Sequence, residues 1–295
     1  MQVAFVTYHK FPDLYEDDQL LQQYLIQKDI EVIPVSWDNS SINWQQFDWI
    51  ILRSMWNYFE QPIEFDKWLD KLASLNCNVL NPISVVKWNQ NKNYFDDFSQ
   101  KDVQLPAYVI CSKNENSTLK QIMQENNWSK AVVKPTISGG AYNTWTTTIE
   151  TVDNDEIRFA ELLQHSDMIV QVFVEEIITK GELSLIFFNK KFSHAIYKKA
   201  KQGDFRVQLQ YGGSVEVIQP DDAILEQAAA LLNNIPENLL YARVDGVVTN
   251  DGKFLLMELE LIEPVLFVST NKNACENFYN ALISVSDTTQ PAHHS

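Results

Sequence analysis

Three carboxylates fall on one predicted β-hairpin near the end of the sequence. Residues 241–264 read YARVDGVVTNDGKFLLMELELIEP, in which an Asp-Gly pair separates two alternating apolar runs. Such a pair between two runs predicts a hairpin with a two-residue turn at residues 251–252. With that turn, Asn250 faces Lys253, and counting back along both strands fixes the cross-strand pairs.

The predicted register opposes acidic side chains. It sets Asp245 opposite Glu258 and Arg243 opposite Glu260, so that the three acids share a face. Directly opposed like charges destabilise a strand pair, and half-buried acids neutralise unless a positive group lies between them. A hard cation held by carboxylate oxygens satisfies both conditions. The alternative is that Arg243 neutralises Glu260 while the other two acids face solvent.

A lysine beside a glycine loop suggests a site for phosphate. Lys134 ends the apolar run AVVKP and is followed by TISGGAYNT, in which Gly139 and Gly140 make the backbone flexible. An ammonium group next to exposed loop amides can hold a phosphate group. The alternative is a lysine that extends into solvent beside an ordinary turn.

Two further segments carry polar side chains next to predicted strands. Gln171 and Glu182 bracket QVFVEEIITKGE, which can present backbone groups to a planar ring and a carboxylate to its sugar, although acidic loop residues are mostly solvated. Arg206 lies in GDFRVQLQYGGS and can stabilise charge on a transferred phosphoryl group. The alternative for Arg206 is a surface ion pair with Asp204 or Glu216.

Composition limits the class of protein. The 295 residues are 45% hydrophobic and 12% aromatic, which predicts a folded protein with a sizeable core. The net charge of -16 disfavours nucleic acid or an anionic membrane as the main partner, although a small anion can bind a local basic pocket.

The cysteines and the N-terminal run indicate the compartment. Cys77, Cys111 and Cys275 are widely spaced, predict neither disulfides nor a zinc site, and favour the reducing cytoplasm. The opening apolar run reads as a first strand and not as a signal peptide. No window approaches the about 20 apolar residues of a membrane span.

The elements that must position these side chains form three α/β units. The expected strands lie at 3–8, 31–36, 49–54, from 108, at 131–134, 143–148, 168–174, 183–188 and 192–199, and the expected helices at 17–27, 65–75, 85–100, 118–126 and 221–233. We therefore expect an N-terminal domain at 1–104, a small lobe at 105–176, a large lobe at 177–285 and a tail at 286–295.

The ordered set of these features resembles the ATP-grasp superfamily, above all its glutathione synthetase-like and D-alanine–D-alanine ligase-like members. The segments VTYHKFP, LRSMWNY, KWNQNKNYF, GDFRVQ, YGGS and MELELIEP are similar to the subgroup that contains the D-cycloserine-forming (O-ureido-serine cyclo-) ligase, over about residues 1–280. The resemblance implies an ATP-grasp fold, with a Rossmann-like pre-ATP-grasp domain and two α/β lobes that clasp the nucleotide. It also implies an ATP-dependent carboxylate–amine ligase that forms an acyl phosphate on a small amino-acid or peptide-like substrate.

The resemblance assigns roles to individual residues. The implied nucleotide contacts are Lys92, Lys134, Gly139 and Gly140 for the phosphates, Gln171 and Val174 for adenine, and Glu182 for the ribose. The implied metal ligands are Asp245, Glu258 and Glu260, which would hold two magnesium ions, or manganese, against the phosphates. Arg206 would steady the transferred phosphoryl group, and Arg243 would bind substrate carboxylate or pair with Glu260.

One position departs from the usual superfamily pattern. The third metal ligand is Asn in most members and is Glu260 here. The additional negative charge should tighten divalent metal binding and raise the pKa of a neighbouring carboxyl group when no metal is bound.

The segment LRSMWNYFEQP is the expected substrate side. Arg53 follows a predicted parallel strand, at the edge of an α/β sheet where ligands bind, and it can grip a carboxylate. Trp56, Asn57 and Tyr58 would line the same pocket. The alternative is that the two aromatic side chains pack against the helix that begins near Phe65.

Other functions remain open at this level. A carboxylate kinase would release the acyl phosphate without using an amine, and an ATP sensor would bind the nucleotide without ligation. A sheet-rich interaction protein leaves the opposed acids unexplained. For the ligase, the expected partners are small carboxylate and amine substrates, with a homo-oligomer left open, and the glycine loops at 139–140 and 212–213 are expected lids.

Overall fold

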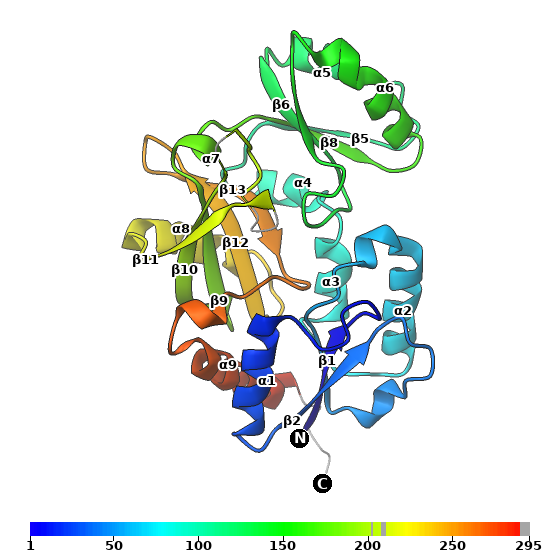
Figure 1. Ribbon diagram of the computed structural model, residues 1–295, viewed down its shortest axis with the longest axis vertical. Coiled ribbons are helices and arrows are strands. Elements are labelled where there is room, and N and C mark those ends of the chain that lie inside the picture. Colours follow the sequence, from blue (N-terminus) through cyan, green and yellow to red (C-terminus); the bar gives the residue numbers. More distant parts are fainter. Residues whose placement is uncertain (202, 208–210, 290–295) are drawn as a thin grey trace.

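The computed structural model describes residues 1–201, 203–207 and 211–289 (Figure 1). Within this part, an N-terminal domain with a parallel sheet is followed by two lobes, each with an antiparallel sheet. The predicted α/β class is confirmed, whereas the boundaries of the three units stay a prediction. No described helix is both long and apolar enough to cross a membrane.

The N-terminal domain is built on four parallel strands in the order β2-β1-β3-β4. Its elements are β1 (Gln2–Thr7), α1 (Glu16–Ile26), β2 (Glu31–Ser36), η1 (Trp44–Gln46), β3 (Trp49–Leu52), η2 (Tyr58–Glu60), α2 (Pro62–Ser74) and β4 (Val79–Leu80). Strand β3 is buried along its whole length, because helices and loops cover both faces of a parallel sheet.

The small lobe follows two short helices. The expected link at 85–100 is divided into α3 (Ile83–Asn89) and α4 (Tyr94–Ser99). The lobe then consists of β5 (Tyr108–Cys111), α5 (Leu119–Glu125), β6 (Lys130–Pro135), β7 (Trp145–Thr148), α6 (Val152–Leu163) and β8 (Met168–Val172), with strand order β5-β8-β6-β7.

The large lobe carries a five-stranded sheet in the order β11-β10-β9-β12-β13. Its elements are α7 (Glu176–Thr179), β9 (Glu182–Phe188), β10 (Lys191–Lys199), β11 (Ser214–Ile218), α8 (Asp222–Asn233), β12 (Tyr241–Val248), β13 (Phe254–Glu260) and η4 (Val268–Thr270).

The C-terminal helix α9 (Ala274–Thr289) was not expected from the sequence. It packs Phe278 into a core shared with Phe5 of β1 and Phe188 of β9, and so joins the N-terminal domain to the large lobe. Residues 286–289, assigned to the tail, continue this helix, and residues 290–295 lie outside the described part.

The acidic hairpin of β12 and β13 has the predicted pairs at its base. Arg243 faces Glu260, and Asp245 faces Glu258. Because side chains alternate across a strand, Asp245, Glu258 and Glu260 lie on one face of the sheet.

The turn of this hairpin differs from the prediction. The Thr249 amide donates to the Lys253 carbonyl, so the loop contains the three residues 250–252 instead of two. An irregularity in the ladder between Asp245 and Gly246 shifts the register back by one residue. The two departures cancel, which is why the predicted acidic pairs are correct.

Candidate active site

The free edge of β13 is held by side chains of the linking helices. The Asn89 side chain donates to the Leu259 carbonyl (2.9 Å) and accepts from the Leu261 amide (2.8 Å). The Tyr94 hydroxyl accepts from the Leu259 amide (3.0 Å). These bonds satisfy edge groups that would otherwise be unpaired. They fix the strand that carries two of the three acids.

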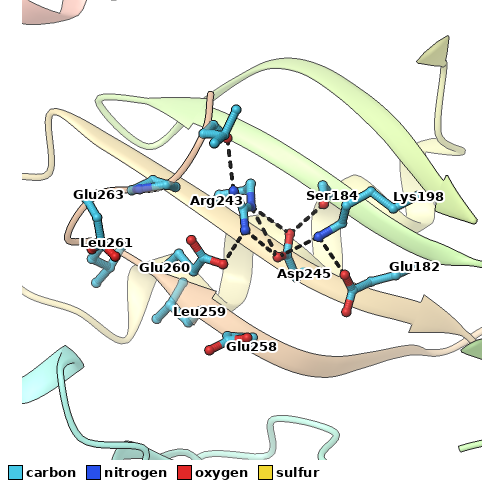
Figure 2. Close-up of polar contacts among 12 residues, drawn as sticks. Glu182, Ser184, Lys198, Arg243, Asp245, Glu258, Leu259, Glu260, Leu261 and Glu263 are labelled. Carbon is cyan, nitrogen blue, oxygen red and sulfur yellow. Dashed lines mark hydrogen bonds and ion pairs between the residues drawn. The ribbon is translucent and has the colours of Figure 1, made fainter. Parts of the chain in front are cut away.

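Asp245 is the most buried acid of the hairpin and has three partners (Figure 2). It is 2% exposed, accepts from the Ser184 hydroxyl (2.6 Å), and forms ion pairs with Lys198 and Arg243 (3.0 Å each). Burial alone would raise the pKa of Asp245, but the two cations outweigh burial and lower this pKa to about 2. Asp245 is therefore an ionised group at neutral pH.

Lys198 is a site residue that the sequence analysis missed. It lies between Asp245 and Glu182, 2.6 Å from a Glu182 oxygen. Burial would lower the pKa of Lys198, but these two acids raise it instead. Lys198 faces Glu182 in the pairing of β9 with β10. An irregularity between Phe192 and His194 shifts the register of this pairing, so counting back from the turn would not have predicted the pair.

Glu258 is near lysine side chains from two other segments of the chain. Lys92, just before α4, lies 3.1 Å from Glu258 and donates to the Ser138 carbonyl (2.8 Å). Burial would raise the pKa of Glu258, but Lys92 and Lys134 lower it. Burial lowers the pKa of the Lys134 ammonium, and Glu258 opposes this effect. Both predicted phosphate-binding lysines therefore lie at the hairpin.

Glu260 is paired with Arg243, as the solvent-facing alternative had proposed for this residue. Burial, together with the charges of Asp245 and Glu258, nevertheless raises the pKa of Glu260 to about 7, and Arg243 only partly opposes this shift. Arg243 also donates to the Val265 carbonyl (3.0 Å). The face is therefore short of positive charge at Glu260.

The loop around Gly139 is covered from two sides. A Cβ at Gly139 would lie 2.9 Å from the Phe59 ring, and Tyr142 packs on the same ring with a centroid distance of 5.5 Å. The Tyr211 hydroxyl donates to the Gly140 carbonyl (3.2 Å). The glycine loop thus contacts both the N-terminal domain and the segment before β11.

The residues expected at adenine lie at the end of β8. Gln171 is buried, with its amide nitrogen 4.0 Å from the Met257 sulfur, and Val174 is buried in the connection that follows. Within the described part of the chain, the Gln171 side-chain oxygen has no hydrogen-bond partner. Together with Glu182, these residues border the hairpin acids on one side.

Arg206 makes the ion pair that was considered as its alternative. Its guanidinium binds Asp204 (2.8 Å) and stacks on the Tyr211 ring, 3.8 Å from the centroid. No contact with the hairpin acids is recorded among the described residues. Residues 208–210 of GDFRVQLQYGGS lie outside the described part.

Arg53 is buried in a network of polar contacts, and its expected role in binding a substrate carboxylate stays a prediction. It is 1% exposed, pairs with Asp18 (2.8 Å), and donates to the Pro264 carbonyl (2.7 Å). Its guanidinium also lies 4.8 Å from the centroid of the Tyr241 ring. Through these contacts, Arg53 links the N-terminal domain to the segment after β13.

The other three residues expected at the substrate point in different directions. The Trp56 indole donates to the Glu263 carbonyl (3.2 Å), whereas the buried Asn57 accepts from the Trp37 indole (2.8 Å) and faces the domain interior. Tyr58 packs on Phe65 of α2, as the packing alternative proposed. Burial raises the pKa of Tyr58, followed by the charges of Glu263, Glu260 and Glu258, so its ring also borders the acids.

The donor set fits a magnesium–nucleotide complex. No three of the described His, Cys, Asp and Glu residues form a complete metal cage by themselves. Magnesium, however, is usually bound by one or two carboxylates together with phosphate oxygens, and the opposed pair Asp245–Glu258 with Glu260 beside it supplies such carboxylates. The cations of this face already pair with its acids, so a polyphosphate would require divalent cations to accompany it.

Comparisons with known proteins agree with this geometry. Residues 3–81 match the family of the N-terminal domain of D-cycloserine synthetase DcsG, and residues 98–268 match the RimK-like ATP-grasp domain family. The cycloserine biosynthesis protein DcsG of Streptomyces lavendulae is 27% identical over 272 residues, which are 83% of this chain and 86% of that protein.

Solved structures show the same fold. The crystal structure of D-cycloserine synthetase DcsG has a TM-score of 0.87 at 23% identity and covers 97% of this chain and 100% of its own. The D-alanine–D-alanine ligase of Bacillus anthracis, complexed with ATP, has a TM-score of 0.68 at 14% identity, with 98% of each chain covered. The ATP-grasp ligase PsnB, complexed with a precursor variant, Mg and ADP, has a TM-score of 0.66 at 14% identity and covers 96% of this chain and 98% of its own.

Relatives of this chain thus bind ATP or ADP and Mg, and a single family accounts for more than half of its length. The chain belongs to the RimK-like ATP-grasp family and is an ATP-grasp ligase of the class that forms C–N bonds.

Proposed function

We propose that the protein uses Mg-ATP to convert the carboxyl group of a small amino-acid or peptide-like substrate into an acyl phosphate, which an amine then attacks. The observation that carries this proposal is the opposed pair Asp245–Glu258 with a lysine on each side, Lys198 at Asp245 and Lys92 at Glu258. Acids and lysines interleaved in this way match a polyphosphate and its counter-ions.

The lysines of the site change partners when the nucleotide binds. Lys92 pairs with Glu258, Lys198 pairs with Glu182, and the charge of Glu258 acts on the buried Lys134. Each of the three lysines can turn its ammonium group to a phosphate oxygen. Asp245, Glu258 and Glu260 would hold magnesium, which would supply neutralisation of the phosphate charge. Glu182 and Gln171 then border the nucleoside end of the site.

Catalysis rests on positioning and charge. An oxygen of the substrate carboxylate attacks the γ-phosphorus of ATP, and the bond to ADP breaks; the amine then attacks the acyl carbon, and phosphate leaves. Arg243 lies beside the acids with its charge directed to this region, where it can stabilise the developing oxyanion. Arg206 stacks on Tyr211, whose hydroxyl donates to the Gly140 carbonyl, so Tyr211 connects Arg206 to the glycine loop. From this position Arg206 can steady the phosphoryl group.

The relatives suggest where to look for the product. DcsG is named for cycloserine biosynthesis, and the D-alanine–D-alanine ligase for joining two amino acids. Ring closure of a single amino-acid derivative is therefore the first product class that we propose to examine, and dipeptide formation is the second.

The test is ADP release with Mg-ATP across a panel of amino acids, their derivatives and dipeptides, with product masses read from the same wells. We expect ADP together with a condensed or cyclised product that is lighter by one water. ADP that requires a carboxylate but no amine would instead support a carboxylate kinase. Tight ATP binding without any ADP release would support an ATP sensor.

A binding measurement tests the phosphate contacts separately. Lys134→Ala removes a cation from a buried phosphate site and should weaken ATP binding by about 10- to 100-fold, measured by calorimetry. Lys120→Ala is the matched control, because Lys120 lies in the same lobe and pairs with Asp153 at the surface. Equal ATP affinity of the two variants would refute the role of Lys134.

A further inference from the structure

The acids of the site form a row that continues beyond the metal-binding positions. Figure 2 shows Glu182 at one end of the row, Asp245 and Glu258 in the middle, then Glu260, and Glu263 at the opposite end. In the proposed function, Glu182 borders the nucleoside and the middle of the row borders the phosphates. Glu263 therefore lies past the phosphates, on the side where the substrate must be.

The backbone around Glu263 is held by the N-terminal domain. The Trp56 indole donates to the Glu263 carbonyl (3.2 Å), and Arg53 donates to the carbonyl of the next residue, Pro264 (2.7 Å). The chain after β13 is thus fixed at two consecutive peptides.

The Glu263 carboxyl group is buried without a side-chain partner among the described residues. The residue is 9% exposed, and the hydrogen bond that its carboxyl group receives comes from its own backbone amide. Burial raises the pKa of Glu263 well above its usual range, and the charge of Glu260 adds to this effect. A buried carboxylate without a cation is costly, which points to a positive group that the described residues do not supply.

The nearby cations are committed elsewhere. Arg243 pairs with Asp245 and Glu260 and donates to the Val265 carbonyl. Arg53 is fixed between Asp18 and Pro264. Both lower the pKa of Glu263 through space, but neither forms an ion pair with it in the described structure.

We propose that Glu263 is a specificity-determining residue that binds the α-ammonium group of the amino acid whose carboxyl group is activated. This inference rests on the proposed function. A substrate carboxylate beside the phosphates and Arg243 places the ammonium group, two bonds away, on the outer side of the row, where Glu263 lies. The carboxylate and the ammonium group then form a charge-assisted hydrogen bond in a site closed by Trp56 and Tyr58.

The test compares matched pairs of probes on the protein loaded with Mg-ADP. Each pair consists of an amino acid and the same acid without its amino group: D- or L-alanine with propionate, and D- or L-serine with 3-hydroxypropanoate. Binding is measured by ligand-observed nuclear magnetic resonance. We expect the wild-type protein to bind the amino acid of at least one pair tenfold or more tightly than its partner.

Three variants assign this preference to Glu263. Glu263→Gln keeps the shape but loses the charge and should bring the ratio within each pair close to one, whereas Glu263→Asp should keep part of the preference. Glu64→Gln, on the exposed side of α2, should leave it unchanged. ADP affinity should be the same in all variants, which separates loss of ammonium binding from a disturbed fold.

The outcomes separate the two proposals. A preference that survives in Glu263→Gln, or a wild-type protein that binds both members of every pair equally, overturns the role of Glu263 while ATP-dependent ligation can still stand. A preference lost only in Glu263→Gln, without any ADP release by the wild-type protein, supports Glu263 and overturns ligation. Neither binding nor ADP release with any probe would overturn both.

Discussion

The two edges of the five-stranded sheet are built in opposite ways. At the β13 edge, Asn89 and Tyr94 bond the backbone of the outer strand, and this strand carries the acids. At the β11 edge, Val217 is 60% exposed, and Glu216 pairs with Lys199 at the surface. The sheet places its chemistry at the supported edge, because acids that must oppose one another need a backbone that cannot move apart.

The same contrast holds for the segments next to these strands. After β13, Arg53 and Trp56 fix the chain at Pro264 and Glu263. Before β11, Arg206 is held chiefly by its near neighbour Asp204. Local contacts of this kind leave a segment free to rearrange when a ligand binds, whereas contacts from a distant domain do not. The segment after β13 is thus held by the N-terminal domain, whereas the Arg206 side chain before β11 is held by near neighbours.

The largest expected difference is between the two glutamates on the outer strands. Glu258→Gln removes a charge opposite Asp245 and should lower Mg-dependent ADP release by more than about 1,000-fold, since charge neutralisation supplies most of the catalysis. Glu216→Gln, the matched change at the exposed edge, should keep wild-type turnover. Thermal melting by circular dichroism should show both variants folded. Wild-type activity in Glu258→Gln would exclude this residue from metal binding.

The two arginines provide the next comparison. Arg53→Ala leaves the buried Asp18 without its cation and should lower the free energy of unfolding by about 3–5 kcal/mol. Arg206→Ala breaks a partly exposed pair and should change this free energy by less than about 1 kcal/mol. Urea denaturation measures both. A stable Arg53→Ala protein with impaired substrate use would support the carboxylate-binding role expected from sequence.

The support of β13 can be removed directly. Asn89→Ala leaves the Leu261 amide unpaired and the Leu259 carbonyl with only the long hydrogen bond from the Tyr94 hydroxyl (3.5 Å), and should cost about 1–3 kcal/mol of stability. Ser214→Ala, on the exposed strand β11, is the control and should have almost no effect. Metal-dependent turnover should fall in Asn89→Ala even below its melting temperature. Equal stability of the two variants would mean that the edges do not differ.

The sequence predicted the acidic face because alternation and the Asp-Gly pair are local signals. It did not predict the irregularity in the β12–β13 ladder, although Gly246 is a sign of it in the sequence. A Cβ at Gly246 would lie 2.4 Å from the Phe254 ring and 2.6 Å from the Leu255 carbonyl oxygen, so only glycine fits there. A glycine inside an apolar strand was the available warning.

Other parts of the site depend on contacts that a single sequence does not reveal. Lys198 faces Glu182 only because of a second irregularity, in the pairing of β9 with β10. Arg53 is buried in an ion pair with Asp18, which is distant in the sequence. Glu263 stands in the quoted motif MELELIEP, but its importance depends on having no side-chain partner among the described residues, which is a property of the folded site. Local patterns therefore gave the elements and the acidic pairs, and long-range packing decided the roles.

The smallest predicted effect concerns pH. The pKa of Glu260 is raised from 4.5 to about 7, so the folded state binds its proton more tightly than the unfolded state. The resulting stability is fully present below pH 4.5 and is lost as the pH rises through 7. The side chain is 28% exposed, so solvent screening limits the loss to about 1–3 kcal/mol.

Glu260→Gln tests this effect, because a neutral amide cannot titrate. The fall in unfolding free energy between pH 5 and pH 8 should be smaller in Glu260→Gln than in the wild-type protein, with the remaining slope due to Glu182 and Glu263, whose pKa values burial also raises. Glu216→Gln should keep the wild-type slope, since its pKa is lowered by Lys199 and it stays ionised over this range. Mg-ADP should flatten the wild-type slope, because a metal-bound carboxylate must be deprotonated at every pH where the metal binds. An identical slope in the wild-type protein and in Glu260→Gln would mean that another acid of the row binds the proton and that Glu260 does not titrate between pH 5 and pH 8.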